Sequence, residues 1–453
     1  MTAFALPGEP AYNAATAVFN LSAPPQPDAA VTARSVDDVR TAVEQARRVG
    51  TTLRVHTTGH AAGAVRPVRA SALVRTELAG EVEVDAERRI ARVPAGTRWE
   101  AVVDATAPYG LMASHGSSGT VGVVGYVLRG GLSPYGRAVG LAANALRAIE
   151  LVTADGELRR VDAESDPELF WALRGGGGGF GVVTAVELEL FPLSTVITGM
   201  AVWSGSDAER LFATWLNWTS DAPLAATTSV RVMNLPDVPD VPPELAGKTT
   251  FAVDGLVHAT SEDQLDDVRG HAEDLLGPLR AAATPLIDTW QETVPSAVLK
   301  AHMDPDDPVP ILGDHLLLDE LDDIGAGRLL DTLGEGSPLV VAGLRQLGGA
   351  YATPSRPGGA LDRLDAAFSY GGSGLVFEPA HAEAIREHGG RLRAAMSPWD
   401  TGRTVPGFVE DFDQPQGHLT AEQVARVRAV RTRVDPDGLF RDDVAPGEGG
   451  VPQ

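Results

Sequence analysis

Glycine residues are concentrated in two parts of this chain, and they constrain its fold more than any other feature. Between residues 110 and 141, glycines stand among small and apolar residues at positions 116, 119, 122, 125, 130, 131, 136 and 140. Five more follow without interruption from Gly175 to Gly179. Glycine permits left-handed backbone and close approach of the main chain to another group. Both segments are therefore expected to be loops whose backbone lies against a neighbour or a ligand.

The apolar periodicity around these loops predicts a mixed fold of helices and strands. Ser35 and Asp38 have the spacing of a helix capping box, and the apolar residues after them lie on one helical face as far as Gly50. Asp155-Gly156 between two apolar runs is a hairpin signal, and a second hairpin is indicated by the alternation at 81–84 and 89–93. Further strands are predicted at 52–55 and 182–190, and helices at 169–173, 261–276, 379–396 and 421–434.

The distribution of glycine and of apolar residues changes after Phe191-Pro192. The 453 residues allow about two or three domains at roughly 150 residues each. Glycine clusters become rarer beyond this point and helical periods become longer, which predicts a second domain from about Leu193 to about Asp400. A stretch of Pro, Gly, Thr and Asp without periodicity separates it from the last helix and a Pro/Gly-rich tail.

The composition excludes several kinds of chemistry. The 61 acidic and 37 basic residues give a formal net charge of −24, which opposes binding to nucleic acids and anionic membranes. The chain has no cysteine, so disulfides, thiolate metal sites, cysteine nucleophiles and cysteinyl cofactor linkages are excluded. The first 30 residues lack the charged start and the apolar run of a signal peptide or a membrane span. We therefore expect a soluble, cytoplasmic protein.

The glycine segments do not match the common nucleotide-binding motifs. The run of five glycines follows a predicted helix and precedes a strand, which is the reverse of the dinucleotide fingerprint. There is no P-loop sequence, and Gly116-Ser117-Ser118-Gly119 lacks the spacing of a serine-hydrolase nucleophile elbow. Two interpretations remain open: the loops are tight turns only, or their backbone N–H groups and nearby hydroxyls hold a diphosphate.

His60 is the most informative titratable residue. It follows Gly59 in a loop of small residues, so its ring is not required to fill a core, although a structural role stays open. The pair His56 and His60 could suggest a metal. Metal sites normally need three ligands, and the intervening Thr-Thr-Gly disfavours presentation on one helical face. We predict no metal site.

A set of motifs occurs in one order between Val55 and Thr184. They are Val55-His56-Thr57-Thr58-Gly59-His60, the segment from Gly116 to Tyr126, Gly130-Gly131-Leu132-Ser133, Leu151-Val152-Thr153-Ala154-Asp155-Gly156 and the segment from Leu169 to Thr184. Together they resemble the FAD-linked oxidases of the vanillyl-alcohol-oxidase and berberine-bridge-enzyme superfamily, in particular its bacterial branch. At the C-terminal end the superfamily has an Asn-aromatic pair, where this chain has Gly407-Phe408.

The resemblance implies a fold, a domain arrangement and a cofactor. The fold is α+β, with a two-subdomain FAD-binding domain of the PCMH type that carries an inserted α+β substrate domain built on an antiparallel sheet. Residues 1–193 would form the first part of the FAD-binding domain, 194–400 the substrate domain and 401–453 the return to the FAD-binding domain. In such enzymes the histidine that matches His60 is bonded to the 8α-methyl carbon of the flavin. Ser118 stands where doubly linked members have cysteine, so a single linkage is implied.

The resemblance also implies site residues and a reaction. The cofactor-binding residues would be His56, Thr57, Thr58, Gly59, His60, Ala61, Gly116, Ser117, Ser118, Val121, Gly122, Gly125, Tyr126, Gly131, Leu132 and Val183. The enzyme would transfer a hydride from a small organic substrate, such as an intermediate of secondary metabolism, to flavin N5, with O2 as the reoxidant. Candidate bases for the accompanying proton are Tyr351, Tyr370 and Glu378, and the charge of Arg345 would favour a tyrosinate.

Two other functions stay open at this point. One is a flavin-binding but redox-neutral cyclase or lyase of a biosynthetic pathway, and the other is a non-catalytic ligand-binding protein. In each case the sequence predicts a small-molecule ligand and neither nucleic acid nor membrane as a partner. It carries no signal for an oligomeric state.

Overall fold

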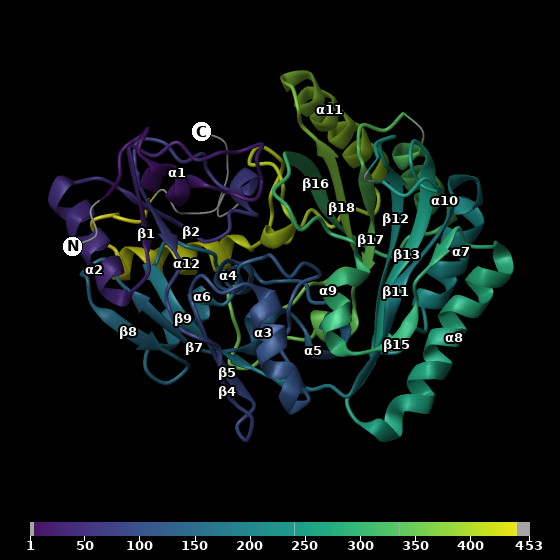
Figure 1. Cartoon of the computed structure of the whole chain (residues 1–453), viewed down its shortest axis with the longest axis horizontal. Coiled ribbons are helices and arrows are strands. Elements are labelled where there is room, and N and C mark those ends of the chain that lie inside the picture. The colour runs from purple at the N-terminus through teal and green to yellow at the C-terminus, as the bar shows by residue number, and fades with distance from the viewer. Residues whose placement is uncertain (1–3, 240, 335, 442–453) are drawn as a thin grey trace.

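Two halves of the molecule face each other in the computed structural model, which describes residues 4–239, 241–334 and 336–441 (Figure 1). The first half, in purple and blue, carries three small β-sheets and also holds the yellow C-terminal helix. The second half, in teal and green, is built on one large antiparallel sheet. This arrangement confirms the predicted α+β fold class.

The first half contains a parallel sheet, an antiparallel sheet and a two-stranded ribbon. The parallel sheet has the order β1-β3-β2, with β1 (Ala29–Ala33), β3 (Ala72–Thr76) and β2 (Leu53–His56). The antiparallel sheet has the order β4-β5-β9-β7-β8, with β4 (Glu83–Asp85), β5 (Ile90–Pro94), β9 (Val182–Glu189), β7 (Leu146–Val152) and β8 (Leu158–Val161). The ribbon pairs β6 (Leu111–Met112) with β10 (Phe191–Pro192).

Helices fill the spaces around these sheets. They are α1 (Pro10–Thr16), α2 (Val36–Val49), α3 (Trp99–Thr106), α4 (Val123–Leu128), α5 (Gly136–Val139), α6 (Pro167–Leu173) and α12 (Ala421–Val434), with the 3₁₀ turns η1 (Ala62–Ala64), η2 (Ala107–Tyr109) and η3 (Ala142–Ala145). One buried cluster contains Trp99 of α3, Phe170 of α6 and Val427 of α12. The C-terminal helix therefore shares a core with the first half, although it follows the second half in the chain.

The large sheet organises the second half. Its order is β14-β11-β13-β12-β17-β18-β16, and β15 also pairs with β11. The strands are β11 (Thr195–Ser204), β12 (Ala226–Asn234), β13 (Thr249–Ala259), β14 (Ile287–Asp288), β15 (Gln291–Thr293), β16 (Ile311–Leu318), β17 (Val341–Gln346) and β18 (Phe368–Leu375). All of these strands lie inside 194–400, the range predicted for the substrate domain. The exact domain boundaries stay a prediction, and the tail at 442–453 lies outside the described residues.

One face of the large sheet is covered by helices. They are α7 (Ala208–Thr219), α8 (Leu265–Ala282), α10 (Asp323–Leu333) and α11 (Pro379–Met396), whose buried apolar residues share a single cluster with the sheet. The short α9 (Val298–Ala301) lies elsewhere in this half, as do the turns η4 (Gly205–Asp207), η5 (Glu262–Gln264) and η6 (Pro295–Ala297). The turns η7 (Gly349–Ala352) and η8 (Pro406–Phe408) pack against the core of the first half through Tyr351 and Phe408. The opposite face of the sheet is turned toward the first half (Figure 1). Within the described ranges, no helix is long and apolar enough to cross a membrane.

Several local predictions are confirmed. The α2 helix begins with the predicted capping box of Ser35 and Asp38 and ends at Gly50, whose φ of 70° is left-handed. The predicted hairpin strands 81–84 and 89–93 overlap the antiparallel pair β4 and β5, each of which ends one residue later, and Asp155-Gly156 joins β7 to β8. The predicted bounds of α11 and α12 match the observed ones.

Candidate functional site

A cavity of about 880 Å³ lies between the two halves. The first half contributes the loop after β2 (54–65), parts of 116–132 and parts of 177–183. The second half contributes His302, Asp304 and Pro305, residues from β16 and β17, and residues from α11. Residues 407–413 complete the wall. The volume lies near the upper end of the range for small-molecule and cofactor sites.

The cofactor-binding residues predicted from the resemblance surround this cavity. All of them except Gly131 line it. A Cβ on Gly131 would lie 2.5 Å from the Tyr126 ring, and its φ of 75° is left-handed. Gly131 therefore allows Tyr126 to pack, and Tyr126 itself lines the cavity. The structure thus brings together loops that are separated by more than a hundred residues in the sequence.

His60 lies on the cavity wall in a defined environment. Its ring stacks on Phe19, with centroids 3.7 Å apart and planes 14° from parallel. Its Nε2 lies 3.2 Å from the Thr120 hydroxyl, which lies 2.9 Å from the Ser118 hydroxyl. Burial lowers the pKa of His60 to about 4, and its hydrogen bond to Thr120 and the charge of Asp304 offset this only in part. The imidazole is therefore neutral near pH 7, so one of its two ring nitrogens carries a lone pair.

Two features of the wall fit a large, partly polar ligand. Gly125 of α4 lines the cavity, and a Cβ built on it meets nothing within 4 Å, so a side chain there would occupy cavity space. The Tyr126 hydroxyl is buried and has no hydrogen-bond partner among the residues described. Buried polar atoms are normally paired, so this hydroxyl is suited to a ligand. The donor-rich loops, the open space at Gly125 and the neutral ring of His60 are together suited to binding FAD.

The second half places a histidine and a buried ion pair against the same cavity. His302 lines it, and its Nδ1 lies 2.8 Å from Asp254 Oδ1. The Arg231 Nε donates to Asp254 Oδ2 at 2.7 Å. Burial raises the pKa of Asp254, but the charge of Arg231 and the hydrogen bond from His302 outweigh it and hold the pKa at about 2. Because the ionised carboxylate only accepts, Nδ1 carries the proton, and Nε2 lies 3.9 Å from Asp304 Oδ1.

The three predicted bases do not line the cavity. Tyr351 is buried in the core of the first half, where its ring packs on Gly136 and its hydroxyl donates to the Ser133 carbonyl. Burial raises its pKa, and the charges of Arg345 and Arg137 do not reverse this. The tyrosinate that Arg345 was expected to favour is therefore not supported.

Tyr370 and Glu378 have structural surroundings as well. Tyr370 belongs to the cluster on the helix-covered face of the sheet. Its neighbour Ser369 lies opposite Arg345, and neighbouring residues of a strand point to opposite faces, so the Tyr370 side chain points away from the cavity. Burial also raises its pKa. Glu378 is exposed at the start of α11, where its carboxylate lies 3.5 Å from His381. Neither Tyr370 nor Glu378 lines the cavity.

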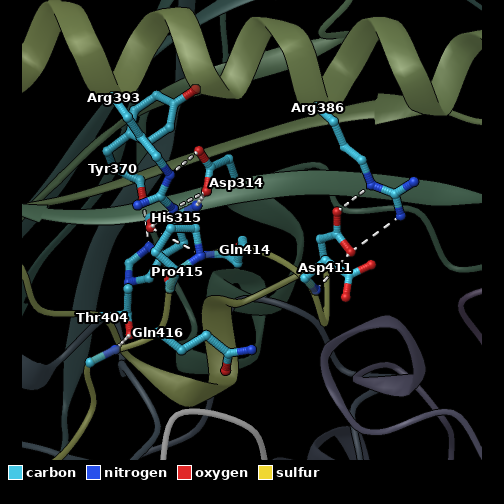
Figure 2. Close-up of polar contacts among 12 residues, drawn as sticks. Asp314, His315, Tyr370, Arg386, Arg393, Thr404, Asp411, Gln414, Pro415 and Gln416 are labelled. Atoms are coloured by element: carbon cyan, nitrogen blue, oxygen red, sulfur yellow. Dashed lines mark hydrogen bonds and ion pairs between the residues drawn. The ribbon is translucent and has the colours of Figure 1, made fainter. Parts of the chain in front are cut away.

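The segment 401–420, here called the C-terminal return, is fixed to the large sheet by a polar network (Figure 2). Figure 2 shows Arg393 and Arg386 reaching down from α11: Arg393 pairs with Asp314 of β16, and Arg386 Nε donates to Asp411 Oδ2 at 2.7 Å. Gln414 donates to the carbonyl of His315 at 3.2 Å. The network holds residues 407–413 against the cavity, a contribution that the resemblance did not predict.

Acid should weaken this network through His315. The Val405 N–H donates to Nε2 at 2.9 Å, so Nδ1 carries the proton and donates to the Tyr370 carbonyl. Burial lowers the pKa of His315 to about 3, whereas an unfolded histidine titrates near 6.5. The unfolded chain therefore binds more protons below pH 6.5, and stability falls as pH falls. We expect a loss of about 2 kcal/mol between pH 6.5 and 5 from this residue.

Urea unfolding of the wild type and of His315→Gln at both pH values measures this contribution. The other buried histidines contribute equally in both proteins. The difference between the two proteins in the pH dependence of the free energy of unfolding therefore isolates the contribution of residue 315. An equal loss of stability in both proteins would show that His315 is not the responsible group.

Other lining residues were missed in the sequence. Burial raises the pKa of Glu410 on the C-terminal return to about 8, with only partial relief from the charge of Arg129. This carboxyl therefore keeps its proton near pH 7. The Ser117 hydroxyl donates to Asp304 Oδ2 at 2.6 Å and joins the two halves. Charged residues inside apolar strands, such as Arg231 and Asp254, are the signal that could have identified the second-half wall.

Comparisons with known proteins agree with this geometry. A family model described as FAD binding domain matches residues 27–162. The uncharacterized FAD-linked oxidoreductase YgaK of Bacillus subtilis is 30% identical over 228 residues, which are 49% of this chain and 51% of that protein. Across four such relatives the chain spans 35% to 64% of their length. They are fungal as well as bacterial, so a place in the bacterial branch is not confirmed.

Two solved structures share the whole fold. The 6-hydroxy-D-nicotine oxidase of Arthrobacter nicotinovorans has a TM-score of 0.80 and 21% identity, with 98% of this chain and 97% of that chain covered. The glucooligosaccharide oxidase of Acremonium strictum, which carries a 6-S-cysteinyl, 8α-N1-histidyl FAD, has a TM-score of 0.77 and 18% identity, with coverage of 99% and 98%. The α+β fold of this chain, with its two-domain architecture, is therefore the same as in these two oxidases.

Proposed function

We propose that this protein is an FAD-linked oxidoreductase that oxidises a small organic substrate in the cavity between its two halves. The observation that carries the proposal is that the donor-rich loops of the matched FAD binding domain and a histidine paired with a carboxylate line one cavity. A bound FAD would supply hydride acceptance and reoxidation by O2. The residues of the first half bind it, and those of the second half act on the substrate.

His60 is the residue that would hold the flavin covalently, through a ring nitrogen bonded to the 8α-methyl carbon. The Thr120 hydroxyl lies 3.2 Å from Nε2 and holds the ring at the wall. Support comes from the neutral state of the ring and from its place on the wall. Ser118 and Thr120 orient the imidazole, and Phe19 fixes its plane by stacking.

His302 is the group that would take the substrate proton. Asp254 accepts from Nδ1, so Nε2 is the basic atom. Arg231 keeps Asp254 ionised and also donates to the His302 carbonyl at 2.8 Å, which fixes the backbone and the ring together. A histidine oriented by a buried carboxylate is suited to general-base catalysis. This proposal replaces Tyr351, Tyr370 and Glu378 as bases.

The experiment that tests the proposed function is a screen of alcohols, amines and phenols for hydrogen peroxide release. A substrate found in this way should also bleach the flavin when O2 is excluded. A protein that turns a substrate over without bleaching would instead be a redox-neutral cyclase or lyase. A protein that binds ligands without turnover would be the non-catalytic alternative.

Replacing His60 with Ala should break the covalent linkage, because no ring nitrogen remains to form it. Wild-type protein precipitated with acid should give a yellow pellet, whereas His60→Ala should give a colourless pellet with any flavin in the supernatant. The His271→Ala variant, changed on α8, is the matched control and should keep its colour in the pellet. A colourless wild-type pellet under a yellow supernatant would mean that FAD is bound without a covalent bond.

A further inference from the structure

Arg345 is a buried guanidinium that faces the cavity with few partners. Its residue is 8% exposed, and it lines the cavity from β17. Its Nη1 donates to the Leu132 carbonyl at 3.3 Å, and its charge lies 5.3 Å from the Phe408 ring centroid. Within the described ranges, no carboxylate forms an ion pair with it. A guanidinium has five N–H donors, so most of its hydrogen-bonding capacity is unused.

Three other buried arginines of the chain have more hydrogen-bond partners than Arg345. Arg174 donates to three backbone carbonyls and to the Ser355 hydroxyl. Arg137 donates to three carbonyls, and Arg231 pairs with a carboxylate. The charge of Arg345 also lowers the pKa of Asp254, but no carboxylate in the described ranges forms an ion pair with its guanidinium. Because a buried charge is costly unless it is paired, Arg345 is suited to a partner from outside the chain.

The register of the sheet places Arg345 beside the proposed base. Asp254 of β13 lies opposite Ser229 of β12, and Ser229 lies opposite Arg345 of β17. Directly opposed residues point to the same face, which here is the one without helices. Strands are about 4.8 Å apart, so the backbones of Asp254 and Arg345 are separated by about 10 Å. A molecule of modest size can therefore reach both Arg345 and His302.

A second unpaired donor lies near Arg345. Tyr126 lines the same cavity, and its buried hydroxyl has no partner in the described part of the chain. Burial raises its pKa well above the usual value, and the nearby charge of Arg345 opposes this only in part. The hydroxyl therefore stays protonated and can donate. A guanidinium and a phenol that both donate are complementary to an anionic oxygen.

We propose that Arg345, with the Tyr126 hydroxyl, binds an anionic oxygen of the substrate, so that the substrate class is small aromatic or aliphatic compounds with a carboxylate or phenolate group. The inference rests on the proposed function, because it names the substrate of the same site. The anionic oxygen anchors one end of the substrate on β17. The reacting O–H or N–H group then lies toward His302.

Binding of neutral and charged probe pairs to the purified wild type tests the proposal. Benzoate against benzamide reports on a carboxylate, and 4-nitrophenolate against nitrobenzene reports on a phenolate. Calorimetric titration should show tighter binding of at least one anion than of its neutral partner, by about tenfold or more, as expected for charge-assisted hydrogen bonds. Arg345→Gln should remove this preference. Arg269→Gln, on the outer helix α8, should preserve it.

The outcomes separate the inference from the proposed function, because flavin content is measured in the same samples. Equal binding of charged and neutral probes by the wild type would overturn the anion site, whether or not flavin is present. An Arg345→Gln protein that keeps the anion preference would also overturn the anion site, whether or not that protein carries flavin. Tyr126→Phe should weaken anion binding with less effect than Arg345→Gln, and an unchanged affinity would remove Tyr126 from the site.

Discussion

Replacing Gly125 with Leu is expected to abolish flavin binding while the protein stays folded. A Cβ at this position meets no protein atom within 4 Å and points into the cavity, so the leucine side chain competes with the ligand for space. Leucine also has a higher helix propensity than glycine by about 1 kcal/mol, which favours α4. Flavin content of the purified variant should fall by about tenfold or more. The measurement is flavin released from denatured protein, relative to chain concentration.

Gly390→Leu is the matched control for this experiment. Gly390 lies in α11, is exposed, and also has nothing within 4 Å of a built Cβ, but it does not line the cavity. Its substitution should leave flavin content unchanged. A Gly125→Leu protein that folds and still carries an equimolar amount of flavin would place the cofactor elsewhere.

Replacing His302 with Gln is expected to lower kcat by about 10²- to 10⁴-fold, the range that general-base catalysis supplies. Glutamine can still donate to Asp254, so the buried ion pair with Arg231 is kept, but it cannot accept a proton. KM should change little, because substrate affinity is assigned to Arg345. Steady-state peroxide release with a substrate found in the screen measures both constants.

Flavin content and the urea midpoint of His302→Gln should equal those of the wild type, which shows that the loss is in the chemical step. His271→Gln serves as the control for a histidine substitution away from the cavity. A His302→Gln enzyme with unchanged kcat would mean that another group takes the proton.

The fold was predictable wherever one face of an element is exposed. The capping boxes at Ser35 and Thr420 and the amphipathic faces of α2 and α12 give local signals, because their polar sides meet water. The strands of the large sheet gave no such signal. Eight consecutive residues of β11 are buried, so the alternation that identifies a half-exposed strand is absent.

The site was predictable only where its residues are close in sequence. The loop from His56 to Gly63 and the segment from Gly116 to Tyr126 carry recognisable motifs, and both line the cavity. The group of Arg231, Asp254 and His302 depends on strand register, which sequence spacing does not specify. Tyr351 and Tyr370 were selected by residue type, and the structure buries both rings in apolar cores instead.

The central claim is that FAD lies between the two halves, with its phosphates against the glycine loops and its ring system beside His60. A crystal structure of the protein as purified tests this most directly. The account predicts flavin density in this cavity, in contact with the loop that follows β2 and with α4 at Gly125. A flavin bound at another surface, or a cavity without flavin in a protein that shows no blue absorption, would contradict it.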